Sequence, residues 1–197
     1  ALHKKEDPVV AHQLLLDLGL KDAWYNPHPT RFEQTRHSAR TTLESPCLEG
    51  RRDISHLSSW AIDNEWSADP DDAIGWDGQY LYVHVSDPAS AIAIDSPADL
   101  EARDRGASLY LPETTWRMLS PEATQAYALG LDDRSPAFTF KIALDDELKV
   151  QEVEIFPSII RAKRLSYTQA SQRKDDKELA PLFALAQRLE AGRKAAG

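Results

Sequence analysis

Four aspartates, Asp63, Asp69, Asp71 and Asp72, lie within ten residues and are the strongest candidates for chemistry in this sequence. Carboxylates held this close repel one another unless solvent or a cation offsets their charge. Oxygen ligands from several carboxylates suit Mg²⁺ or Mn²⁺, and two such ions can hold the attacking and the leaving oxygen of a phosphoryl displacement. The cluster therefore predicts a divalent-metal site. The simpler alternative is an acidic loop whose carboxylates cap turns and stay solvated.

Other kinds of carboxylate site are alternatives to a Mg²⁺ site, and the sequence excludes one of them. A calcium-binding EF-hand loop is excluded, because neither Asp63 nor Asp69 begins the required acidic alternation with glycine at the sixth place. A glycosidase acid and nucleophile stay open, since spacing along the chain does not exclude them. Pro70 fixes its own φ and favours an extended Asp69, so we expect the cluster on an irregular loop rather than on a helix.

The aspartate loop leads into a predicted β-hairpin. Residues 73–76 and 79–86 form its two strands, and apolar and polar side chains alternate along the second strand. Asp77 and Gly78 lie between them and are expected to supply the positive φ angles of a two-residue turn.

The rest of the chain mixes helices and strands without a regular βαβ alternation. Ser96-Pro97 and Ser120-Pro121 open two short helices, which Gly106 and Gly130 are expected to close. The later elements are a strand with Phe138, Phe140, Ile142 and Leu144 on one face, a returning strand over 150–156, an extended run over 159–167, and an amphipathic helix from Leu179 to Leu189. This order favours an α+β fold, with a mixed β-sheet and flanking helices.

We expect two parts along the chain: an N-terminal helix and linker over 1–52, and a domain over 53–197. Asp7 and Pro8 are typical of a helix start, and Gly19 of a helix end. Residues 21–59 show no sustained hydrophobic period and contain several prolines, which indicates a linker.

Composition limits the class of protein. The 197 residues carry a net charge of −9, but residues 51–100 hold two basic and ten acidic groups, whereas residues 151–197 hold nine and six. An acidic centre and a basic tail suit a cation site and a separate surface for an anion. No apolar run approaches the roughly 20 residues that cross a bilayer. The single cysteine, Cys47, cannot form an internal disulfide, which favours a reducing cytoplasm.

The neighbours of the aspartates reveal a family resemblance. The matching segments are Ile62-Asp63, Asp69-Pro70-Asp71-Asp72-Ala73, Val83–Pro88, Arg105–Pro112, Met118-Leu119 and Ile160–Tyr167. In order and spacing they resemble the catalytic domain of the ribonuclease II and ribonuclease R family, from about Asp53 to Tyr167. The resemblance implies a processive 3′ to 5′ exoribonuclease that hydrolyses single-stranded RNA to 5′-mononucleotides with Mg²⁺.

The resemblance also implies roles for single residues. Asp63 and Asp72 would ligate the metal most directly, and Asp69 and Asp71 would complete the shell or position water. Tyr110 matches a tyrosine that stacks on a base at the RNA 3′ end, and such stacking tolerates any base.

Two further candidates for RNA contacts are ambiguous. Tyr167 matches a tyrosine near the ribose, or else it is a core-facing aromatic at a strand end. Arg105 could reach phosphate, or it could complement the dipole at a helix C-terminus.

Two departures from the family pattern shape the expected partners. Family members usually carry OB-type domains on both sides of the catalytic domain, and residues 1–50 do not show alternating strands. The later half of that domain, with an arginine near the scissile phosphate and a second stacking aromatic, has no match here. The chain resembles the front part of such an enzyme. Its expected partners are single-stranded RNA, the remaining part of the catalytic domain and a C-terminal RNA-binding domain, and exposed apolar surface is expected where the remaining part packs.

Two other functions stay open. The first is a non-catalytic RNA-binding or regulatory relative that keeps the acidic loop. The second is an unrelated carboxylate enzyme.

Overall fold

A mixed β-sheet organises the protein in a computed structural model that describes residues 7–31, 33, 35–111 and 114–196. Its seven strands have the order β1-β8-β7-β4-β3-β2-β9, with antiparallel pairs in the centre and parallel pairs at both edges. The strands are β1 (Arg52–Asp53), β2 (Ser59–Asp63), β3 (Asp72–Trp76), β4 (Tyr80–Ser86), β7 (Ser135–Leu144), β8 (Val150–Ile160) and β9 (Ala162–Ser166). A separate hairpin pairs β5 (Leu109–Leu111) with β6 (Thr114–Trp116). The α+β prediction is confirmed.

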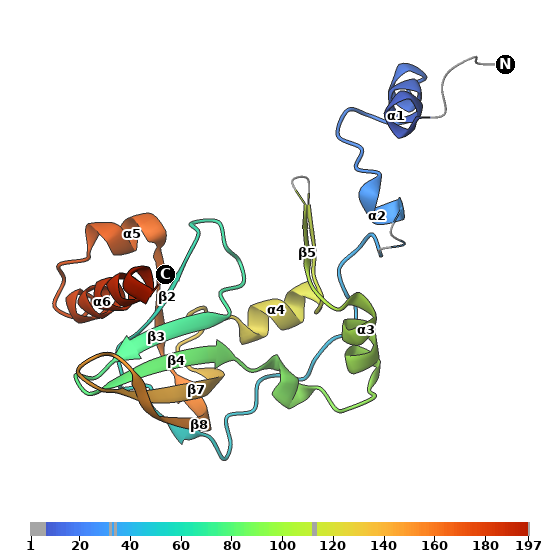
Figure 1. The fold of residues 1–197 in the computed structure, drawn as a ribbon. Coiled ribbons are helices and arrows are strands. Elements are labelled where there is room, and N and C mark those ends of the chain that lie inside the picture. The colour runs from blue at the N-terminus through green and yellow to red at the C-terminus, as the bar shows by residue number, and fades with distance from the viewer. Residues whose placement is uncertain (1–6, 32, 34, 112–113, 197) are drawn as a thin grey trace.

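The helices are α1 (Pro8–Asp17), α2 (His28–Arg31), a 3-10 turn (Pro88–Ala91), α3 (Pro97–Arg105), α4 (Pro121–Tyr127), α5 (Tyr167–Gln172) and α6 (Ala180–Ala196). Figure 1 shows α5 and α6 together beside the sheet, whereas α1 and α2 lie away from it at the N-terminal end. Within the described ranges, no helix is both long and apolar enough to cross a membrane.

Both faces of β2 are buried, which places the core on either side of the sheet. One cluster consists of Ala61, Ala73, Leu129, Ala137, Ile160 and Ala162. The other lies beneath α5 and α6 and consists of Trp60, Leu165, Ala170, Leu179 and Leu182. Trp60 and Ala61 are neighbours on β2, and successive strand side chains point to opposite faces. The strand that ends at Asp63 is therefore fixed from both sides.

Several predicted boundaries are confirmed and others shift. Ser96 and Ser120 cap α3 and α4, and Gly106 ends α3 in the left-handed conformation. The second helix stops at Tyr127, three residues before Gly130. Gly130 instead has a positive φ in a loop, where an added Cβ would lie 2.9 Å from the Ala162 carbonyl oxygen.

Two other predictions need correction. Of Asp77 and Gly78, only Gly78 has a positive φ. The Asp77 carboxylate instead accepts the backbone N–H groups of Gln79 and Tyr80, each at 2.8 Å, so a side chain stabilises a longer turn. The extended run over 159–167 divides into the end of β8 and β9, and Tyr167 begins α5.

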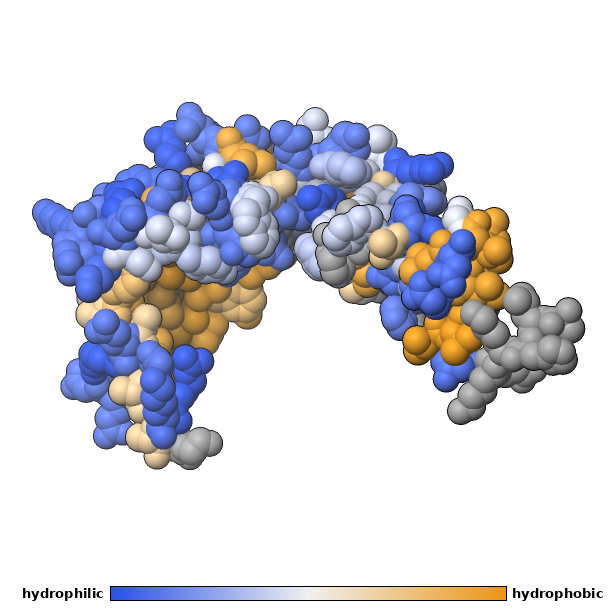
Figure 2. Space-filling model, turned by 90° about the horizontal axis from the view of Figure 1, so that it is seen from above, coloured by the Kyte–Doolittle hydropathy of each residue, from blue (hydrophilic) through white to orange (hydrophobic). Residues whose placement is uncertain are grey.

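An apolar area of the sheet lies open to solvent. Strand pairing places Val83 beside Phe140, and Phe140 beside Ile155, on one face. Val85 and Phe138 are paired on the same face and both are exposed, and Ile155 is 58% exposed. Figure 2 shows apolar side chains gathered in the hollow beside the C-terminal helix. The Phe138 face of β7 is thus its open side, while Ala137 and Thr139 face the core.

Candidate functional site: an acidic cavity beside an aromatic hairpin

The aspartate loop joins two adjacent antiparallel strands. Asp63 ends β2 and Asp72 begins β3. Because these neighbouring strands are antiparallel, the two residues lie at the same end of the strand pair. The loop is anchored on both sides: the Pro70 carbonyl accepts the N–H of Leu129 at 2.7 Å, and the Asp71 carbonyl accepts the N–H of Ser86 at 2.8 Å. The sequence prediction of an irregular loop entering the hairpin is confirmed.

A cavity of about 840 Å³ collects three of the four predicted aspartates, Asp63, Asp69 and Asp71. Asp72 does not line this cavity. Asp72 pairs with Val85, so its side chain lies on the same face of the sheet as Val85 and Phe138. Burial raises the pKa of Asp72, and the charges of Asp71 and Asp63 raise it further. Their carboxylates are thus close enough to repel, and a bound cation would relieve that repulsion.

Asp69 has a basic partner that the sequence analysis did not identify. The Arg117 guanidinium donates to its carboxylate at 2.8 Å, and both side chains are about one-fifth exposed. Arg117 follows β6 and lines the same cavity. The two residues are 48 positions apart, so no local pattern indicated the pair.

Two exposed aromatic side chains also line this cavity. Tyr110 on β5 lines it and is 68% exposed, so its side chain is accessible from the cavity. Trp66, in the aspartate loop, also lines the cavity and is exposed. Tyr167 lies outside this cavity at the start of α5 and is exposed, so it is not a core aromatic. Its neighbour Ser166 pairs with Asp63 across β9 and β2.

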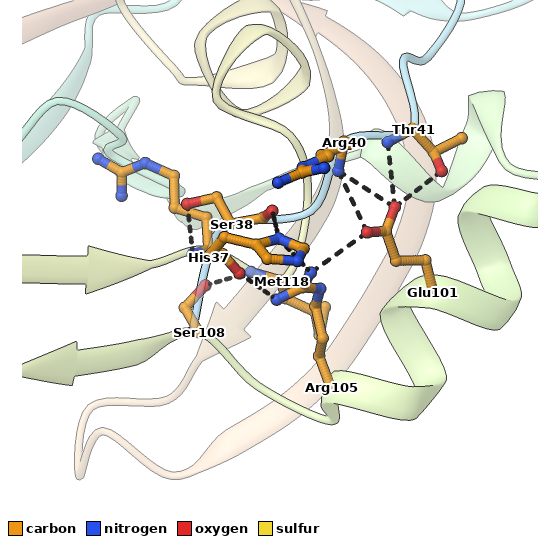
Figure 3. A network of polar contacts seen from close by, with 9 residues as sticks. His37, Ser38, Arg40, Thr41, Glu101, Arg105, Ser108 and Met118 are labelled. Atoms are coloured by element: carbon orange, nitrogen blue, oxygen red, sulfur yellow. Dashed lines mark hydrogen bonds and ion pairs between the residues drawn. The ribbon is translucent and has the colours of Figure 1, made fainter. Parts of the chain in front are cut away.

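Arg105 is placed differently from the other candidates. Its side chain is 7% exposed and donates to the His37 carbonyl at 2.6 Å and to Glu101 at 3.2 Å. It therefore fastens the segment before β1 to α3 (Figure 3). RNA contact by Arg105 stays a prediction that this geometry does not test.

Glu101 completes that anchor. Its carboxylate accepts the Thr41 hydroxyl at 2.7 Å and the backbone N–H groups of Arg40 and Thr41 (Figure 3). These hydrogen bonds, the Thr41 hydroxyl first, lower the pKa of Glu101 to about 2. The same segment reaches the cavity wall, because the Ser38 hydroxyl accepts the N–H of Arg117 at 3.0 Å.

The donor set suits a hard cation without forming a closed cage. Carboxylate oxygens are the ligands that Mg²⁺ prefers, and Mg²⁺ usually keeps several waters and binds through one or two carboxylates plus substrate phosphate. In the part of the chain that the structure describes, no three acidic, histidine or cysteine side chains converge to hold a metal ion by themselves. The residues thus fit a water-rich site that substrate would complete.

Comparison with known proteins identifies the family to which this chain belongs. Residues 51–197 match the RNB domain family, and the chain belongs to it. It is 30% identical over 171 residues to an uncharacterized ribonuclease from Synechocystis, covering 78% of this chain and 26% of that protein. The fold matches Mycoplasma genitalium RNase R in complex with double-stranded RNA, with a TM-score of 0.70, 21% identity, and coverage of 98% of this chain and 37% of that one.

Another solved structure with this fold is relevant to the question of nuclease activity. Yeast Ssd1, described as a pseudonuclease, has the same fold with a TM-score of 0.64, 19% identity, and coverage of 77% of this chain and 21% of that chain. The fold therefore occurs with and without nuclease activity. The chain also spans only about a quarter or less of the lengths of the curated ribonucleases that it matches.

Proposed function

We propose that this chain supplies the acidic part of the active site of a metal-dependent 3′ to 5′ exoribonuclease that acts on single-stranded RNA. One observation carries the proposal: Asp63, Asp69 and Asp71 line a cavity that the exposed side chain of Tyr110 also lines. Such a cavity offers carboxylates for a metal and a flat surface for a base in the same space. Membership of the RNB family supports this reaction over a glycosidase.

The four aspartates would have different roles, which follow from their different surroundings. Asp63 and Asp72 would hold Mg²⁺ or Mn²⁺, since the pKa of Asp72 already responds to the charges around it. A bound metal supplies charge neutralisation at the phosphate and activates water. Asp71 would orient that water. Asp69 is held by Arg117, which positions it and presents a cation where phosphate charge develops.

Aromatic residues would hold the RNA end. Tyr110 would stack on the 3′-terminal base, and Tyr167 would lie near the ribose on the β9 side of Asp63. Both side chains are exposed and so available for contact.

The open apolar face indicates that other protein covers the sheet. We propose that the remaining part of a catalytic domain packs on the exposed side of β4, β7 and β8, and that a C-terminal RNA-binding domain accompanies it. Exposed residues such as Phe138 and Ile155 would then be buried. The lone thiol of Cys47 favours the cytoplasm as the compartment.

A non-catalytic RNA-binding relative is the second candidate, because the pseudonuclease Ssd1 shares this fold and Arg117 already offsets the charge of Asp69. Calorimetric titration with Mg²⁺, together with RNA binding, separates the two. The exoribonuclease predicts Mg²⁺ binding that Asp63→Asn weakens, and slow Mg²⁺-dependent shortening of 5′-labelled RNA from its 3′ end. RNA binding with neither metal binding nor shortening would support the second candidate.

A further inference from the structure

The β5–β6 hairpin has two faces, and each lines a different cavity. Tyr110 pairs with Thr115, and both line the acidic cavity. Thr114 and Trp116 lie on either side of Thr115, and successive strand side chains point to opposite faces. These two residues line a second cavity of about 870 Å³. The hairpin is thus a shared wall between two cavities.

The N-terminal segment forms the other side of this second cavity. Residues 19–22 and 24–26, together with Arg36, line it opposite Trp116. We call this space, between residues 19–26, Arg36 and β6, the N-terminal cleft. Among the residues that the structure describes, none lines both this cleft and the acidic cavity.

Aromatic rings and cations alternate in the N-terminal cleft. The Lys21 ammonium lies 4.1 Å from the centroid of the Tyr25 ring. The Arg36 guanidinium lies 5.7 Å from the Tyr25 centroid and 6.0 Å from the Trp116 centroid. Trp24 also lines the cleft and is 83% exposed, which leaves its ring open for stacking.

The acidic group in the cleft is already engaged. The Asp22 carboxylate accepts the backbone N–H of Trp24 at 2.9 Å and so helps to set the local turn. Among the described residues that line the cleft, Lys21 and Arg36 are cationic and Asp22 is acidic, so together these residues carry a net positive charge in a chain whose total is −9. A ligand with flat rings joined by anionic groups fits both features.

We propose that the N-terminal cleft binds a second stretch of single-stranded RNA, with a base on Trp24 and phosphates beside Lys21 and Arg36. The choice of RNA as ligand rests on the function proposed above. Because the cleft and the acidic cavity share the hairpin, one strand long enough to pass around it occupies both. The cleft then retains the body of the RNA while its 3′ end lies beside the aspartates.

RNA binding by single variants tests the proposal. Fluorescence anisotropy with a labelled single-stranded RNA of about 20 nucleotides, in EDTA to prevent cleavage, compares the parent with Trp24→Ala and Trp24→Phe. Loss of one stacked base is expected to weaken binding about five-fold or more, and the phenylalanine variant is expected to restore most of it. Each variant is first checked for an unchanged circular dichroism spectrum.

Charge variants give an independent measurement. Lys21→Ala is expected to lower the slope of log affinity against log salt by about 0.7, the value for one lost phosphate contact on a single strand. Lys174→Ala removes an equal charge from an exposed position between α5 and α6 and is the matched control, with no change expected. Equal losses from both variants would overturn the proposal, because they would reflect total charge alone.

The remaining outcomes separate the two proposals. If RNA binds, Tyr110→Ala weakens it and Trp24→Ala does not, the N-terminal cleft is refuted while the proposed function stands. If the parent chain does not bind RNA, both are refuted. If polyglutamate of equal charge displaces RNA as well as unlabelled RNA does, the cleft recognises acidic peptides and the stacking proposal fails.

Discussion

The hydrogen bonds of Glu101 are expected to hold the wall of the acidic cavity, and Glu101→Gln tests this. The carboxylate accepts the Thr41 hydroxyl and two backbone N–H groups, and Arg105 donates to it. The segment that it anchors continues to Ser38, which accepts the backbone N–H of Arg117. Loss of the charge should therefore loosen the residue that holds Asp69.

The magnitude follows from the lowered pKa of Glu101. A fall from the ordinary 4.5 to about 2 corresponds to roughly 3 kcal/mol of stability at neutral pH. The side chain is 24% exposed, so solvent screening reduces the expected effect to about 1–2 kcal/mol. Because the folded pKa is lower than the unfolded one, the contribution is complete above about pH 4.5 and is lost as the pH falls toward 2.

Urea denaturation of the parent and Glu101→Gln at pH 7 and pH 3 measures this contribution. The difference in unfolding free energy should be about 1–2 kcal/mol at pH 7 and less than about half of that at pH 3. Glu49→Gln, at an exposed position in the same segment, is the matched control and should change stability by less than about 0.5 kcal/mol. A Glu101→Gln difference that is independent of pH would refute the electrostatic reasoning.

Four further predictions concern the site and the sheet. Asp72→Asn should weaken Mg²⁺ binding by about ten-fold or more in calorimetry, and equal binding would remove Asp72 from the metal site. Tyr110→Ala should change the length of the end product in an exoribonuclease assay of the complete enzyme, with little effect on the chemical step, and an unchanged product ladder would mean that the ring is not used for stacking. Burial lowers the pKa of His84 to about 4, so stability should fall as the pH drops from about 6.5 through 4. His84→Gln should abolish that pH dependence and cost about 1–3 kcal/mol, because the hydrogen bonds to Ser59 and Thr139 are disturbed, and a retained pH dependence in urea titrations would assign it to other groups. Ile155→Lys should reduce binding of an apolar dye and self-association with a stability change below about 1 kcal/mol, and a large destabilisation would show that Ile155 belongs to the core.

Local sequence signals predicted the helix starts and turns that are stabilised by residues close together in the sequence. Ser96 and Ser120 cap helices because a side chain two or three residues away from an N–H can satisfy it. The turn at Asp77 was predicted in place but not in type. The Asp77 carboxylate accepts two backbone N–H groups and so stabilises a longer turn than the expected two-residue turn. The Asp-Gly pair is compatible with both turns, so it does not distinguish them.

Long-range contacts could not be predicted in the same way. The pairs Arg117–Asp69 and Glu101–Thr41 join residues 48 and 60 positions apart. Charged residues are common on any surface, so their types alone do not indicate which of them meet. The hydrogen bond from Arg105 to the His37 carbonyl is a third example, because it joins residues 68 positions apart.

The sequence by itself determined the family and the clustering of four aspartates, because these residues and their neighbours lie in short contiguous stretches with fixed spacing. Only the tertiary structure decided which aspartates share a cavity, that Arg117 neutralises Asp69, and that one hairpin separates two cavities. The physical reason is that side-chain direction within the sheet and the docking of distant segments depend on packing of the whole chain. Spacing along the sequence does not encode these contacts residue by residue.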